Sequence, residues 1–164
     1  MAAVTITDSG VPATDPHTAL KTVIEANMLF PNGSAATVNA SWLEAKKQKT
    51  YQIAIQHVYG ESDLANFGTG SSIAVTSRVF LSVTLFAPTR ADCWTMFGAF
   101  KDLLNNKTIS QPAAGFSDYH YMVIRRSDTT KPFTVLEPNC GPGQSDENCI
   151  GYRADVTVEL RWEE

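Results

Sequence analysis

Residues 77–105 limit the possible fold more than any other stretch, because they predict a strand followed directly by a helix. Residues 77–86 read SRVFLSVTLF, and alternate positions of a strand point to opposite faces of a sheet. One predicted face is apolar and should meet the helices; it carries Val79, Leu81, Val83 and Leu85. This stretch therefore requires a sheet with a covered face.

The helix predicted after this strand has a clear start signal. Thr89 is placed to cap it, and Asp92 three residues later completes a capping-box pattern. Its apolar residues are Cys93, Trp94, Met96, Phe97, Phe100, Leu103 and Leu104. This set is wider than a narrow stripe, so we expect the helix to lie across the sheet, with part of its bulk available to another subunit.

The second face of the same strand carries Phe80 and Phe86 beside Ser82 and Thr84. A solvated sheet face rarely presents two phenylalanines, so we expect a partner surface to cover them. The candidate subunit interface comprises Phe80, Phe86, Arg78, Arg90, Arg125 and Arg126. On this hypothesis, Phe86→Asp should weaken assembly and leave secondary structure intact.

Four further elements are predicted, together with an N-terminal arm and two long loops. Asp15 and Pro16 are suited to the start of a helix that continues through Met28 and ends at residues 31–33. Alternation predicts strands at residues 50–58, 119–126 and 151–162. Residues 1–13 are read as an N-terminal arm, residues 60–76 and 127–150 as long loops, and residues 132–138 as a short edge element.

The order of these elements is α-β-β-α-β-β. Two helices can cover one face of a four-stranded, mainly antiparallel sheet, which predicts a single α+β domain over residues 1–164. A chain of this length can bury a sufficient core without a metal or a cofactor, and we expect neither.

Charge and hydropathy narrow the classes of function. The net charge of −4 argues against a general nucleic-acid binder, which needs clustered Lys and Arg on phosphates. No apolar run approaches the length of a membrane span, and the first residues do not resemble a signal peptide, so we expect a cytoplasmic site of synthesis. Cys93 fits a core position. The sequence leaves two alternatives for Cys140 and Cys149: a disulfide between them, or two free thiols.

Candidate catalytic groups are few. His57, His120 and Tyr121 are the polar side chains that a small ferredoxin-like enzyme or ligand-binding module would use. No spacing pairs a nucleophile with a base, and GTGSS at residues 68–72 lacks the lysine of a phosphate-binding loop. We therefore expect no enzymatic activity, with the ligand-binding module or enzyme kept as an alternative.

The order and pattern of the elements resemble the tail terminator (tail completion) proteins of long-tailed phages and related archaeal viruses. The matching segments are residues 15–28, 51–58, 78–104, 119–126 and 152–162, among them a strand that leads through APTRADCW into an amphipathic helix. The long segments 60–76 and 127–150 depart from the shortest family members.

This resemblance implies a virion protein, assembled in the host cytoplasm, that forms a hexameric ring. The ring would cap the tail tube, stop its polymerisation and meet the neck connector protein. The genome would pass through it without sequence-specific binding. Another tail-tube or head–tail joining protein is the alternative within the same class.

Overall fold

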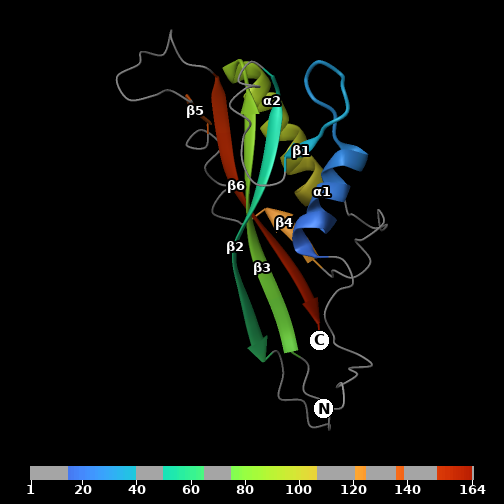
Figure 1. Cartoon of the computed structure of the whole chain (residues 1–164). Coiled ribbons are helices and arrows are strands. Elements are labelled where there is room, and N and C mark those ends of the chain that lie inside the picture. Colours follow the sequence, from blue (N-terminus) through green and yellow to red (C-terminus); the bar gives the residue numbers. More distant parts are fainter. Residues whose placement is uncertain are drawn as a thin grey trace, which may run out of the picture.

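A computed structural model describes residues 15–39, 50–64, 75–106, 121–124, 136–138 and 151–163 (Figure 1). The helical elements are α1 (Pro16–Asn27), α2 (Arg90–Lys101) and the π-helix η2 (Asp102–Asn106) that extends α2. The strands are β1 (Val38–Asn39), β2 (Gln52–Leu64), β3 (Val75–Ala87), β4 (Tyr121–Ile124), β5 (Leu136–Pro138) and β6 (Tyr152–Glu163). The α+β class is confirmed, β5 lies within the predicted short edge element 132–138, and β1 is added to the predicted order.

The strands form one mixed sheet in the order β1-β2-β3-β6-β4, and β5 also pairs with β6. β1 runs parallel to β2, whereas the other pairs are antiparallel. The prediction of four mainly antiparallel strands is therefore right for β2, β3, β6 and β4. It missed β1, because two residues are too short to show alternation.

The hairpin formed by β2 and β3 is longer than predicted. Its strands pair as far as Leu64 and Val75, so the predicted loop 60–76 is wrong at both of its ends. The register shifts between His57 and Tyr59, which places Val58 as an extra residue in β2. This bulge interrupts the alternation of apolar residues in β2. It lies at residue 58, where the strand predicted from the sequence ends.

The first helix ends earlier than predicted. Met28 is extended, and its N–H donates to the carbonyl of Ile24. A turn at residues 31–33 follows, in which Gly33 has φ of 82°, and Leu29 then pairs with Ala35. A φ in this range suits glycine, since it lacks the Cβ that crowds other residues there. The turn residues therefore close a small loop after the helix and do not end the helix itself.

Both helix starts follow the sequence signals. The N–H of Thr18 donates to the carboxylate of Asp15 over 3.0 Å. The N–H of Asp92 donates to the hydroxyl of Thr89 over 3.1 Å. Each bond satisfies a backbone donor that has no partner within the helix.

The core lies between the sheet and the two helices, which cover the same face (Figure 1). The strands contribute Ile53 and Ile55 from β2, the four predicted apolar residues of β3, and Ala154, Val156, Val158 and Leu160 from β6. The helices contribute Leu20, Val23, Ile24, Cys93, Met96, Phe97 and Phe100. Cys93 is fully buried, as predicted.

The sheet is much longer than the helices that cover it. β2 and β3 each have 13 residues, whereas α1 and α2 each have 12. A strand rises about 3.3 Å per residue and a helix about 1.5 Å, so the strands span roughly 40 Å and the helices roughly 18 Å. The ends of β2, β3 and β6 accordingly project past α1 (Figure 1). We call the part of these strands beyond the core residues Val79 and Leu160, namely residues 61–64, 75–78 and 161–163, the projecting tongue.

Two glycines offer a matched test of the packing. A Cβ at Gly151 would lie 2.6 Å from the carbonyl oxygen of Ala87 and from the ring of Phe86, whereas one at Gly98 would meet nothing within 4 Å. We expect Gly151→Ala to lower the free energy of unfolding by about 1–3 kcal/mol through overpacking. Gly98→Ala should raise it by about 0.5–1 kcal/mol, because glycine is a poor helix former.

Urea unfolding of both variants measures these changes. Equal effects of the two substitutions would contradict the close approach of Gly151 to Phe86.

Candidate functional site

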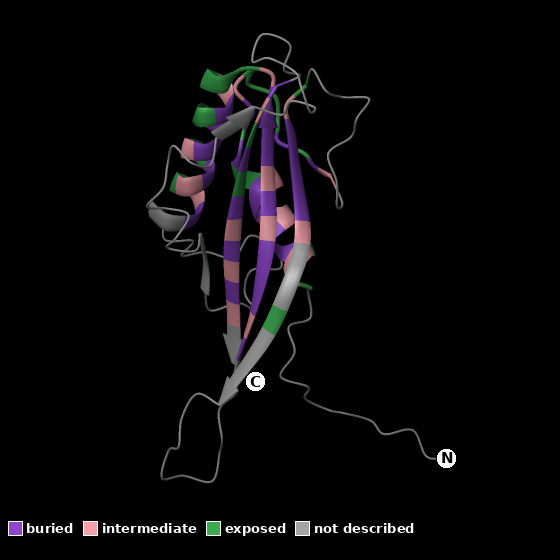
Figure 2. Cartoon of the chain, turned by 90° about the vertical axis from the view of Figure 1, so that its left-hand side faces the viewer, coloured by how far each residue is buried: buried purple, intermediate pink, exposed green. Residues whose placement is uncertain are grey.

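The two predicted interface phenylalanines are buried within the chain itself. Phe80 is 4% exposed and Phe86 is 1% exposed (Figure 2 shows the burial along the strands). The ring of Phe86 lies close to the backbone of Gly151. The expectation that a partner must cover these rings is therefore corrected: alternation showed which face they occupy, but not what the chain places over it.

The Phe86→Asp variant consequently cannot isolate an interface. A carboxylate at a position buried in the single chain carries a desolvation cost of several kcal/mol, which would act on folding first.

The four candidate arginines do not form one described patch. The guanidinium of half-buried Arg78 lies 5.8 Å from the ring centre of Phe80, a cation–π distance. Arg90 is exposed at the start of α2, beyond the opposite end of β3 from Arg78. Arg125 and Arg126 lie outside the described residues.

A polar ladder runs along the face of β6 that points away from the helices. The guanidinium of Arg153 lies 3.4 Å from the carboxylate of Asp155, which also accepts a hydrogen bond of 2.6 Å from Thr84. Farther along, Arg161 Nε donates to Glu159 Oε1 over 2.6 Å. The Arg153–Asp155 pair is exposed and adds little to stability, whereas the Glu159 side chain is mostly buried. Two basic and two acidic side chains give this face a charge pattern that another protein surface can match.

The broad apolar set predicted for α2 includes one exposed aromatic residue. Trp94 is 39% exposed on α2 and packs against Phe97, with ring centres 5.8 Å apart. The buried residues of this helix follow the helical period, namely Cys93, Met96, Phe97, Phe100 and Leu104. Trp94 lies to the side of that stripe, so strict periodicity would have identified it. Leu29, 62% exposed after α1, is the second large apolar residue of this kind among the described residues.

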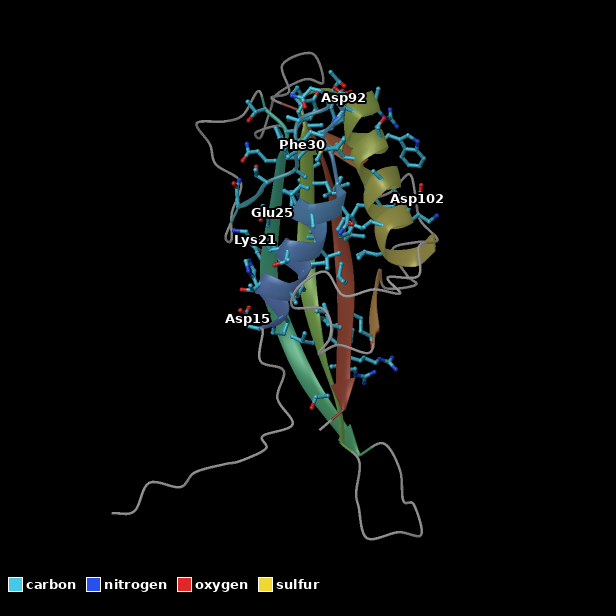
Figure 3. The ribbon with its side chains drawn as sticks, turned by 90° about the vertical axis from the view of Figure 1, so that its right-hand side faces the viewer. Asp15, Lys21, Glu25, Phe30, Asp92 and Asp102 are labelled. Atoms are coloured by element: carbon cyan, nitrogen blue, oxygen red, sulfur yellow. The ribbon has the colours of Figure 1, made fainter. Side chains whose placement is uncertain are left out.

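Tyr51, just before β2, forms an aromatic clamp with the segment after α1 and with the first turn of α2. The hydroxyl of Tyr51 donates to the carboxylate of Asp92 over 3.1 Å, and its ring stacks on Phe30 at 5.7 Å. Phe30 and Asp92 lie at the same end of the molecule (Figure 3). Desolvation, followed by the bond to Asp92, raises the pKa of Tyr51 above its ordinary value. The clamp is a structural contact between the segment after α1, β2 and the first turn of α2.

The candidate catalytic residues are not brought together. His57 lies in β2, in register with Leu81, and Tyr121 lies in β4, in register with Arg161. β3 and β6 separate these strands, and three strand spacings amount to about 14 Å. His120, Cys140 and Cys149 lie outside the described residues. Within the described residues, no cluster of His, Cys, Asp and Glu could hold a metal ion.

No helix in the described part of the chain is long and apolar enough to cross a membrane.

Comparison with known proteins adds no relative: no protein-family model matches the chain, and no curated protein matches it.

The Tyr51 clamp predicts how the stability of the chain depends on pH. A raised pKa means that the native state holds the Tyr51 proton more tightly than the unfolded state, so stability falls as the pH rises through the native pKa. We expect the free energy of unfolding to decline above about pH 10, the usual tyrosine pKa. Tyr51→Phe should lower stability at pH 7 and should flatten this alkaline decline relative to the parent chain.

Denaturant unfolding between pH 7 and 11 measures both effects. An alkaline decline of equal steepness in the two proteins would show that Tyr51 does not contribute to it.

Proposed function

We propose that this chain is a structural subunit of a virus tail that acts as a tail terminator. In this role, copies of the chain form a ring, hexameric as the resemblance implies, on the end of the tail tube. The ring stops tube growth and receives the neck connector. The genome passes through it without sequence-specific contacts, and the protein has no enzymatic activity.

The projecting tongue is the observation that carries this proposal. An enzyme of this size usually needs a concave site, whereas a ring subunit needs an extended element that reaches a neighbour. The tongue extends a rigid sheet beyond the helical layer and is stiffened by pairing of β3 with both β2 and β6. Such an element can contact an adjacent subunit or the tube while the helical half keeps its own core.

Two exposed features of the helical half support a contact between subunits. Trp94 offers a large aromatic surface on α2, and aromatic residues are enriched in protein interfaces. The polar ladder on β6 offers charges of both signs on the opposite side of the sheet. A ring subunit presents two different surfaces to its two neighbours, so two dissimilar patches on opposite sides suit that geometry.

The ring can be tested with the purified full-length chain. Native mass spectrometry and light scattering should find a closed oligomer, and labelled chain should locate to the junction of head and tail in assembled particles. A chain that stays monomeric at high concentration and is absent from particles would refute the proposal. Incorporation along the whole tube would favour the alternative role of a tail-tube protein.

Trp94 provides a specific test of the subunit contact. We expect Trp94→Gln to reduce the oligomer fraction and to change the free energy of unfolding of the monomer by less than about 1 kcal/mol, because the ring is already partly exposed. Ala99→Gln, at another exposed position of α2, is the matched control and should leave the oligomer intact. Sedimentation velocity compares the two variants. Equal oligomer fractions would exclude Trp94 from the contact.

A further inference from the structure

The turn after α1 contains a chemically reactive pair of residues. Asn32 is followed by Gly33, and the sequence has no other Asn-Gly pair. Both residues are exposed, as is Ser34 after them. The backbone nitrogen of a residue can attack the side-chain amide of a preceding asparagine, and glycine places no side chain in the path of that attack. A Cβ at Gly33 would meet nothing within 4 Å, so the space beside this residue is open to water.

Ser34 holds the side chain of Asn32 in one orientation. The N–H of Ser34 donates to Asn32 Oδ1 over 3.0 Å, and its hydroxyl donates to the same oxygen over 2.7 Å. Donors at these distances stabilise the negative charge that develops on a carbonyl oxygen when a nucleophile attacks its carbon. The turn therefore activates the Asn32 amide as well as exposing it.

The nitrogen of Gly33 is restrained in the closed turn. Its N–H donates to the carbonyl of Phe30 over 2.8 Å, and the N–H of Phe30 donates to the carbonyl of Ser34 over 2.8 Å. Attack on Asn32 requires the Gly33 N–H to leave its partner. A hydrogen bond contributes about 0.5–1.5 kcal/mol net, so this exposed bond opens without unfolding of the core.

We propose that Asn32 is a site of self-modification, at which the chain converts an amide into a carboxylate with Ser34 as the activating residue. The Gly33 nitrogen loses its proton and forms a bond to Asn32 Cγ. The bond from Cγ to the side-chain nitrogen breaks, and that nitrogen leaves with the proton as ammonia. Water then opens the resulting cyclic imide at one of its two carbonyls, which yields aspartate or isoaspartate. This inference concerns the single chain and does not depend on the virus-tail role.

The site is linked directly to the Tyr51 clamp. The backbone N–H and carbonyl of Phe30 close the turn, and the ring of Phe30 stacks on Tyr51 at 5.7 Å. Aspartate leaves the backbone of this turn unchanged, whereas isoaspartate inserts an additional methylene group into it. The isoaspartate product therefore alters the loop that holds Phe30 in the clamp.

Peptide mapping of the full-length chain tests the proposal. The protein is stored in mildly alkaline buffer and then digested with trypsin, which releases residues 22–46 as one peptide. The same peptide contains Asn27 of α1 and Asn39 of β1, which serve as internal controls. We expect Asn32 to gain the mass difference between an amide and a carboxylic acid about tenfold faster than either control. Equal conversion of the three residues, or none at Asn32, would overturn the proposal.

Variants of Ser34 separate the effect of the folded turn from that of the Asn-Gly pair alone. Ser34→Ala removes the hydroxyl and keeps the backbone N–H, whereas Ser34→Thr keeps both and is the matched control. We expect the folded Ser34→Ala chain to convert Asn32 about three- to tenfold more slowly than the parent chain, with Ser34→Thr close to the parent. In urea, where the turn is lost, the three proteins should convert equally. Equal rates in the folded state, or a difference that persists in urea, would overturn the role of Ser34 in the turn.

Discussion

The register in which β2, β3 and β6 pair is the constraint on which the rest of the structure depends. Ile55, Val83 and Val156 lie opposite one another across the three strands, and all three are essentially fully buried. A strand has a side-chain period of two, so a slip of one residue would turn this row to the opposite face. Burial of each such side chain contributes about 1.5–3 kcal/mol, which makes any other register strongly unfavourable.

Both helices follow from this register because it creates the apolar face that they cover. α1 packs on the β2 side of the sheet, and α2 packs on β3 and β6. Their starts are set locally by Asp15 and Thr89, whose side chains accept backbone N–H groups. The Tyr51 clamp then links the segment after α1 to the first turn of α2. The helical half thus has its own core, and the Tyr51 clamp fastens one end of it.

The functional proposal relies on shape and surface, not on chemistry. The described residues place His57 and Tyr121 on strands that two others separate. They leave Trp94 and the Arg153–Asp155 pair exposed. A long sheet, a shorter helical layer and dissimilar patches on its two sides suit a subunit that binds copies of itself. The bulge at Val58 has a part in this, because it lets β2 continue to Leu64 after its apolar alternation has ended.

Periodicity and capping chemistry made the main elements predictable from the sequence. The alternation of residues 77–86 and 151–162 identified β3, β6 and their buried faces, because solvent and core select opposite residue types at a period of two. Asp15 and Thr89 located the helix starts, since a cap acts within its own turn. The same local rules could not reveal β1, which is held by its pairing with Ile53 and Ala54.

The sequence by itself determined which residues of each element face the core and where each helix begins, because these depend on neighbours within one turn or one strand. Only the tertiary structure decided what covers each surface. Phe80 and Phe86 looked available to a partner, yet the folded chain buries both. Trp94 was one of a broad set of apolar residues on its helix, and the structure shows that it is the exposed one, at 39%. Burial is a property of segments brought together from distant positions, such as Gly151 beside Phe86, and no local pattern records that contact.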